Sequence, residues 1–218
     1  MRHLFIFLLL ISTVLSARVY DRNFGRGLKL PDQHVLESVT VTTPSTASTA
    51  NILPGHPADI SGVAVTVTAF EAVPGVARTI AITPTGVTAD VKAGDAVITG
   101  TNIKGETITD TLAFLDNAST ATTSVKAFKT ITSILFPVED SPYTATWAVG
   151  TTDAFGLDHC MAAAGDIAWA TAAGARESTD PTCVADVDEM EKNVCDPNTA
   201  ANASKSFVFY YIQNFRCF

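Results

Sequence analysis

The side chains that most often carry chemistry in proteins are few in this chain and widely spaced. Its four histidines are His3, His34, His56 and His159, and its four cysteines are Cys160, Cys183, Cys195 and Cys217. The histidines lack the H-x-x-x-H spacing of a metal-binding helix, and no C-x-x-C pair occurs, so the sequence predicts no zinc site. Phosphate loops, nucleophile elbows and dinucleotide fingerprints are also missing. We therefore expect no catalytic residue, no metal and no cofactor.

One short stretch does place a carboxylate, an imidazole and a thiol in succession, at Asp158, His159 and Cys160. The chemistry this would support is attack by a cysteine thiolate with histidine as the base. Adjacent side chains on a strand point to opposite faces, so His159 and Cys160 would not meet there. We therefore expect Cys160 to be a disulfide cysteine in a loop.

The acidic run "DVDEME" at residues 186–191 has the residue types of a calcium site. It lacks the central glycine and the spaced glutamate of an EF-hand loop, so we interpret Asp186, Asp188 and Glu189 as a solvated face. A hydrolase with paired carboxylates needs proximity in space only, and no specific pair is marked by the sequence. A hydrolase function therefore remains an alternative, and it would require a concave site that contains such a pair.

Cysteine number and position favour covalent cross-links. An even count, confined to the last third of the chain, predicts two disulfides and leaves all three pairings open. The alternative is four free thiols in a reducing compartment. Asn117 and Asn202 each begin an "NAS" triplet, which is a glycosylation acceptor only in a host that performs that modification.

The elements that would position these residues are strands. From Val63 onward, stretches such as "VAVTVTAF", "RTIAITPT" and "YTATWAVG" alternate apolar and polar residues. A turn at residues 102–105 separates two such stretches, and Gly105 can adopt the positive φ that it requires. Short strands spaced by turns predict an all-β fold, an antiparallel β-sandwich of jelly-roll or immunoglobulin-like type. Trp147, within an alternating stretch, is expected in the core.

The flanks of this sandwich, which we place at residues 38–158, differ from it. Residues 1–17 resemble a secretory signal peptide, with an apolar run too short to span a bilayer comfortably. Residues 18–37 lack periodicity and are interpreted as an extended arm. Residues 159–206 are expected to be a loop-rich, cysteine-containing segment with room for a short helix. Residues 207–218 form a final aromatic strand that either returns to the sheet or pairs with a neighbour.

Composition excludes one large class of function. The chain has 218 residues, of which 47% are hydrophobic and 17% charged, and its formal net charge is -8. Such a chain can bury a core and is not expected to be disordered. Its negative charge disfavours nucleic-acid binding, which needs clustered lysine and arginine.

Four stretches together resemble small virion proteins of tailed phages, usually encoded among the head genes. They are "VTADVKAGDAVITGTNIKGETITDTLAF", "NASTATTSVKAFKTITSILFPV", "WAVGTTDAFGL" and "VADVDEMEKNVCDPNTAANASKSFVFYYI". The resemblance spans roughly residues 39–212. It implies a β-sandwich of the head-decoration or head-fibre type, assembled as an oligomer and without an active site. The signal-like segment and the cysteines depart from this pattern.

Two functions follow as expectations. The first is a non-enzymatic virion structural protein on the capsid exterior, a homo-oligomer with a trimer as one option. In it the arm and the last strand contact neighbouring copies and a major capsid or other virion protein. The second is a secreted or cell-surface adhesin or carbohydrate-binding module, whose partner would be a host glycan. Aromatic side chains clustered on one exposed face would favour the second, whereas an isolated, buried Trp147 would count against it.

Overall fold

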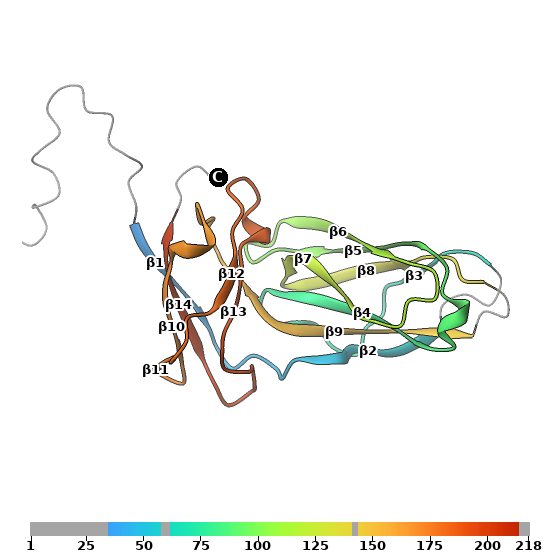
Figure 1. The fold of residues 1–218 in the computed structure, drawn as a ribbon, viewed down its shortest axis with the longest axis horizontal. Helices are drawn as coiled ribbons and strands as arrows, with labels where there is room; N and C mark the ends of the chain where they lie inside the picture. Colours follow the sequence, from blue (N-terminus) through green and yellow to red (C-terminus); the bar gives the residue numbers. More distant parts are fainter. Residues whose placement is uncertain (1–34, 58–61, 141–143, 214–218) are drawn as a thin grey trace, which may run out of the picture. The chain divides into compact units, whose positions relative to one another are not determined.

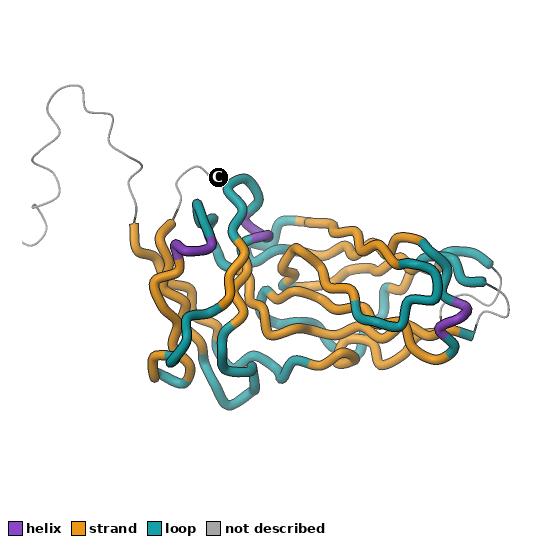
Figure 2. Tube along the Cα trace, viewed as in Figure 1, coloured by secondary structure: helices purple, strands orange, loops and turns teal. Residues whose placement is uncertain are grey.

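The computed structural model describes residues 35–57, 62–140 and 144–213 of the chain, and Figure 1 shows how its strands are arranged. Strands make up most of the described residues, with only three short 3-10 helices among them (Figure 2). The strands are β1 (Val35–Val41), β2 (Ser48–Pro57), β3 (Val65–Val67), β4 (Arg78–Gly86), β5 (Gly94–Thr101), β6 (Thr107–Phe114), β7 (Thr122–Phe128), β8 (Thr130–Phe136), β9 (Ala145–Gly156), β10 (Ile167–Ala172), β11 (Ala175–Arg176), β12 (Thr182–Val184), β13 (Val194–Asp196) and β14 (Phe207–Gln213). The 3-10 helices are η1 (Thr88–Asp90), η2 (Ala164–Asp166) and η3 (Met190–Lys192).

The strands form three sheets, and every pair of neighbouring strands is antiparallel. Sheet A has the order β1-β14-β10-β11. Sheet B has the order β12-β13-β9-β4-β7, with β2 paired to β9, and sheet C has the order β3-β8-β5-β6. The predicted all-β, antiparallel sandwich is therefore confirmed.

Sheets B and C pack face to face around the larger hydrophobic core. Strand β6 shows the physical reason, since its residues alternate strictly between exposed and buried and so present one apolar face. Trp147 lies at the centre of this core and is fully buried, as expected, against the rings of Phe114 and Phe136. Its indole Nε1 donates a hydrogen bond of 2.7 Å to Glu139 Oε1, so the polar group of the buried ring is satisfied.

A second core lies beneath sheet A. Phe207, Phe209 and Tyr211 point inward from β14 and are fully buried, and they meet Phe155 near the end of β9. Strand β9 thus contributes Trp147 to the first core and Phe155 to the second. In Figure 1 this strand runs from the side of β2 and β4 to the side of β13.

A buried arginine lies where the two cores meet. Arg78 begins β4 and has no exposed surface. Its guanidinium donates to the carbonyl oxygen of Thr152 and, at 2.6 Å, to that of Ser45, and it lies 3.6 Å from Asp153 Oδ1. The same group lies over the ring of Phe155, 5.0 Å from its centroid. Burial lowers the pKa of Arg78 to about 10, against the opposite effect of Asp153, so the group stays charged at neutral pH.

Close strand packing requires glycine at two positions. A Cβ on Gly150 of β9 would lie 1.7 Å from the carbonyl oxygen of Ser48 in β2. A Cβ on Gly100 of β5 would lie 2.0 Å from the carbonyl oxygen of Thr130 in β8. Both glycines are beside irregularities in strand register, where the backbones approach more closely than side chains allow.

One expected boundary is wrong. Strand β1 begins at Val35, inside the segment assigned to the arm, because Val35–Val41 pairs with Phe207–Gln213 along its whole length. Residues 159–206 are loop-rich and hold disulfide-bonded cysteines, as expected, and they also contain the short strands β10 to β13 and the short helices η2 and η3. Residues 1–34, and with them the signal-like segment and most of the expected arm, lie outside the described residues.

The last strand returns to the sheet. Both edges of β14 are occupied, by β1 on one side and by β10 on the other. Of the two alternatives left open by the sequence, pairing within the chain is therefore correct. The expectation that this strand contacts neighbouring subunits through strand pairing is wrong for residues 207–211, where both of its edges are paired within the chain. Residues 214–218 lie outside the described part of the chain.

We predict that Arg78→Ala lowers the free energy of unfolding by about 3 kcal/mol, because the carbonyl groups of Ser45 and Thr152 lose their buried donor. Urea unfolding followed by tryptophan fluorescence measures the change. The matched control is Lys92→Ala, which removes an exposed ion pair to Asp140 and should cost less than about 1 kcal/mol. Equal unfolding midpoints for the two variants would show that the bonds from Arg78 to Ser45 and Thr152 do not stabilise the fold.

Candidate functional site

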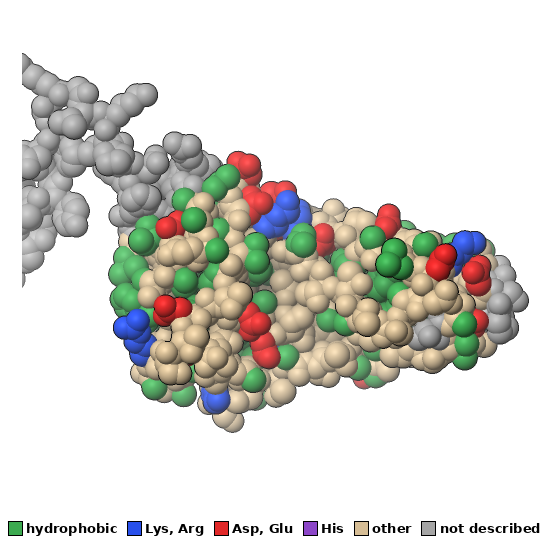
Figure 3. Space-filling view, in the orientation of Figure 1, with side chains coloured by type: hydrophobic (Ala, Val, Ile, Leu, Met, Phe, Trp, Pro, Cys, Tyr) green, Lys and Arg blue, Asp and Glu red, His purple; other side chains and the backbone are tan. Residues whose placement is uncertain are grey.

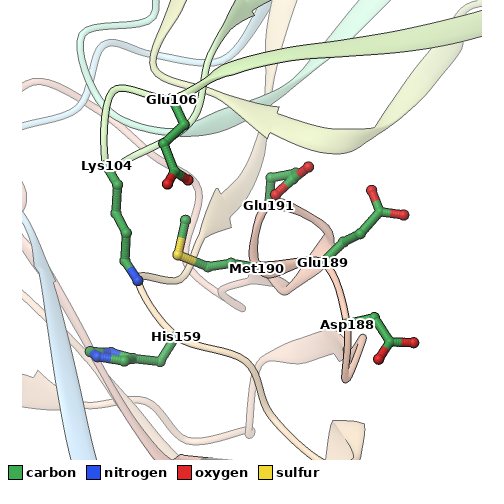
Figure 4. Close-up of a pocket in the computed structure, with 7 residues that line it drawn as sticks. All are labelled: Lys104, Glu106, His159, Asp188, Glu189, Met190 and Glu191. Atoms are coloured by element: carbon green, nitrogen blue, oxygen red, sulfur yellow. The ribbon is translucent and has the colours of Figure 1, made fainter. Parts of the chain in front are cut away.

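Three of the residues singled out in the sequence, His159, Asp188 and Glu189, line one pocket, which is shown in Figure 4. It encloses about 240 Å³ and lies between the β5–β6 turn, the residues after β9 and the segment around η3. Its lining residues are Lys104, Glu106, His159, Asp188, Glu189, Met190 and Glu191. Figure 4 shows the Lys104 ammonium on the His159 side of the pocket, away from Asp188.

The turn that carries Lys104 forms as the sequence predicted. Gly105 has a φ of +87°, and its N–H donates to the carbonyl oxygen of Asn102 at 3.1 Å. The Asn102 side chain completes the turn, since its Oδ1 accepts from the N–H groups of Lys104 and Glu106 at 3.0 Å each. Asn102 Nδ2 also donates to Glu106 Oε2 at 2.8 Å. This carboxylate is therefore held in place at the pocket wall.

The side chains of Asp158 and Tyr211 contact Nδ1 of the His159 ring. The buried Tyr211 hydroxyl donates to Asp158 Oδ1 at 2.5 Å, and His159 Nδ1 lies 3.2 Å from both oxygens. Burial raises the pKa of Tyr211, and its hydrogen bond to Asp158 raises it further, so the phenol stays protonated and keeps donating. The His159 ring, which lines the pocket, is therefore held in one orientation by its Nδ1 contacts.

Cys160 is not available as a nucleophile beside His159, because it is disulfide-bonded. A second disulfide joins Cys183 in β12 to Cys195 in β13, where the two residues face each other in register. No cysteine in the described part of the chain is free, as the sequence predicted. Cys217 lies outside the described residues.

Two acidic residues of the pocket, Glu189 and Glu191, and the neighbouring Asp186 are paired with lysines. Lys126 Nζ lies 2.6 Å from Glu189 Oε2 and 3.0 Å from Glu191 Oε1, and Lys192 is paired with Glu189 and Asp186. Burial acts to lower the pKa of Lys126, but its hydrogen bonds to Glu189 and Glu191 outweigh this effect and raise it. Hydrogen bonds from Lys126 and Lys192 lower the pKa of Glu189. The interpretation as a solvated face holds for the exposed Asp188 and is incomplete for the half-buried Asp186 and Glu189.

Sequence reasoning missed the side chain that shapes this acidic segment. Asn193 is fully buried, and its Nδ2 donates to the carbonyl oxygens of Asp186 and Glu189 at 2.8 and 3.0 Å. Its Oδ1 accepts from the N–H groups of Met161 and Asp186 at 2.8 and 3.1 Å. One amide thus satisfies backbone groups from two loops. An asparagine between an acidic run and a cysteine carries no signal of this role.

The two glycosylation triplets are in different surroundings. Asn117 is exposed in the turn between β6 and β7, with a φ of +58°. Asn202 is half-buried, and its Oδ1 accepts from the N–H of Ser204 at 2.9 Å. Access therefore favours Asn117 over Asn202 as an acceptor.

Two half-buried aromatic side chains lie next to each other on the outer face of sheet A. Trp169 of β10 stacks on Tyr210 of β14 with ring centroids 4.7 Å apart, and the Arg176 guanidinium lies over the Trp169 ring at 5.9 Å. Both rings are half-buried. Hydrophobic side chains gather at the end of the described unit where β1, β10 and β14 lie (Figure 3).

The described residues form neither a metal-binding cluster nor a membrane-spanning helix. Among the described residues, no group of three or more histidine, cysteine or acidic side chains is placed to hold a metal ion. Within that same part of the chain, no helix has the length and apolar character to cross a membrane. Comparison with protein-family models, curated proteins and solved structures finds no match for this chain.

We predict that Asn193→Ala lowers the free energy of unfolding by about 3 kcal/mol, because four backbone groups lose the buried side chain to which they are bonded. Chemical unfolding of the oxidised protein measures the loss. The matched control is Asn198→Ala at an exposed position, which should change stability by less than about 0.5 kcal/mol. An Asn193→Ala protein as stable as the control variant would refute the role given to this amide.

The ion pairs also predict a pH dependence. The pKa values of Glu189 and Asp186 are lowered in the folded state, so their contribution to stability is present above their unfolded values and is lost as the pH falls through the folded ones. We expect Glu189→Gln to lose less stability than the wild type between about pH 5 and pH 3. Thermal unfolding across this range tests it, with the exposed Glu71→Gln as control. Parallel curves for wild type and Glu189→Gln would count against the pairing.

Proposed function

We propose that this chain is a non-enzymatic structural protein of a virion exterior, where it stabilises or decorates the capsid as a homo-oligomer. The observation that carries the proposal is a disulfide-bonded antiparallel sandwich in which the edge strand β1 of sheet A has no second partner among the described strands. Disulfides persist outside the cell, where a particle must survive, and a sandwich of this kind serves as a rigid module that binds through its surface.

The pocket supports the same proposal. The carboxylates of Glu106, Glu189 and Glu191 are engaged by Asn102, Lys126 and Lys192, and Cys160 is disulfide-bonded. These carboxylates and this cysteine therefore connect loops and strands in the structure. The resemblance to tailed-phage head proteins, carried by residues from β5 to β14, points to the virion and to a capsid protein as the second partner.

A secreted adhesin or carbohydrate-binding module is the second candidate, because Trp169 and Tyr210 cluster on the outer face of sheet A. Sugars stack on the open faces of aromatic rings. Here Trp169 is flanked by Tyr210 and by Arg176, which occupy the ring faces that a sugar would need. Trp147, the other tryptophan, is buried in the core. The geometry therefore favours the structural role over glycan binding.

The deciding experiment locates the chain and reads its first residue. Particles from a producing culture are purified by density gradient and a high-salt wash, and intact-mass and N-terminal analysis are applied to them and to the free secreted fraction. We expect a stoichiometric amount of the chain in the particles. Isotope-labelled free protein, added before purification, is the control for adventitious adsorption. A chain found only in the secreted fraction would overturn the virion proposal in favour of the adhesin.

A further inference from the structure

The open edge of sheet A is the feature that the fold leaves unused. Strand β1 pairs with β14 over all seven of its residues, and among the described residues no strand pairs with its other side. An open strand edge presents unpaired N–H and C=O groups and is a template for another strand. Folded proteins usually protect such edges, so the protection of the other edges in this fold is informative.

The other sheet edges are short, interrupted or covered. Strands β3, β11 and β12 have three, two and three residues. Strand β2 is broken by shifts in register and contains Pro54 and Gly55. The eight-residue edge strand β6 of sheet C is bridged to the edge of β7 by its own Asp110, whose Oδ2 accepts from the N–H groups of Val125 and Lys126 at 2.7 and 3.1 Å. Among the described strands, β1 is the long, continuous edge that has no such device.

The residues of β1 suit it to pairing. Its outward side chains are Leu36, Ser38 and Thr40, all exposed and uncharged, and Leu36 is 54% exposed. Its one charged residue, Glu37, is half-buried opposite Tyr211. A groove of about 240 Å³ adjoins residues 39–42 and is also lined by Val76 and Ile103. A strand edge beside an apolar groove is the arrangement that strand addition uses.

We propose that β1 pairs antiparallel with the β1 of a second copy, about a two-fold axis at Ser38, the middle residue of the strand. This inference deepens the proposed function and rests on its premise that the chain assembles with copies of itself. A two-fold contact must be self-complementary, so each residue has to tolerate its symmetry mate. Full overlap of Val35–Val41 places Ser38 opposite Ser38 and Leu36 opposite Thr40, without like charges on the outward face.

Pairing of this kind would join two copies of sheet A into one continuous sheet. The half-buried apolar side chains next to β1, Ile212 and Tyr210 of β14, would then extend across the junction on the same face as Leu36. The groove beside residues 39–42 would receive the start of the partner's strand. The contact would therefore combine backbone hydrogen bonds with apolar burial, the two sources of affinity in strand addition.

Charge exchange at Ser38 tests the proposal on the full chain. Ser38→Lys and Ser38→Glu each place like charges opposite one another at the axis, whereas a mixture of the two variants places opposite charges there. Analytical ultracentrifugation of the wild type should show a dimer or an even-numbered multiple of it. Each variant alone should associate at least ~10-fold more weakly, because juxtaposed like charges are costly, and an equimolar mixture should recover the association. Circular dichroism and thermal unfolding verify that the variants fold.

The matched control is Thr109→Lys, an exposed change on the edge strand β6, which should leave association unchanged. A monomeric wild type, or Ser38 variants that associate as tightly as the wild type, would overturn the proposal. Loss of association without recovery in the mixture would also overturn it, since the partner would then be another surface. The particle experiment tests the virion proposal independently of the β1 contact. If the chain forms the β1-paired dimer but is absent from particles, the virion proposal is refuted and the β1 contact is retained.

Discussion

A buried guanidinium between two hydrophobic cores is the interaction on which the rest of the structure depends. Arg78 opens β4 in the larger core, and its donors reach Thr152 of β9 and Ser45 of the connection from β1 to β2. An arginine without solvent contact is tolerated only when its donors and charge are satisfied, and here carbonyl oxygens, Asp153 and the Phe155 ring do so. The guanidinium therefore ties the connection from β1 to β2 to strands β4 and β9 of sheet B.

Strand β9 transmits this constraint along the molecule. It pairs with β2, β4 and β13, and it places Trp147 in one core and Phe155 in the other. The Glu139 carboxylate that accepts from Trp147 and the Asp158 carboxylate that accepts from Tyr211 fix a polar atom in each core. A buried polar atom restricts the core to the packing arrangements in which that atom is hydrogen-bonded. Apolar contacts alone are compatible with many packing arrangements.

How much the sequence reveals depends on how local each feature is. Alternation identified most strands of the sandwich, and the glycine turn at Gly105 was predictable because both signals lie within a few residues. The central position of β14 and the bonding of Arg78 and Asn193 were not, since they arise from segments far apart in the chain. The same limit applies to the pocket. The acidic run is evident in the sequence, but its partner Lys126 lies in β7, far from the run along the chain, so no local pattern predicts the ion pair.

The disulfide between β12 and β13 has a mechanical consequence. Cys183 and Cys195 are 12 residues apart, and the loop that they close contains the acidic residues of the pocket wall and Asn193. A chain stretched from its two ends cannot extend this loop, which withholds about 40 Å of contour length from the pull. Force applied along the chain passes through the sulfur atoms instead of the loop. This wall of the pocket would therefore remain folded back on itself even after the sheets around it had been pulled apart.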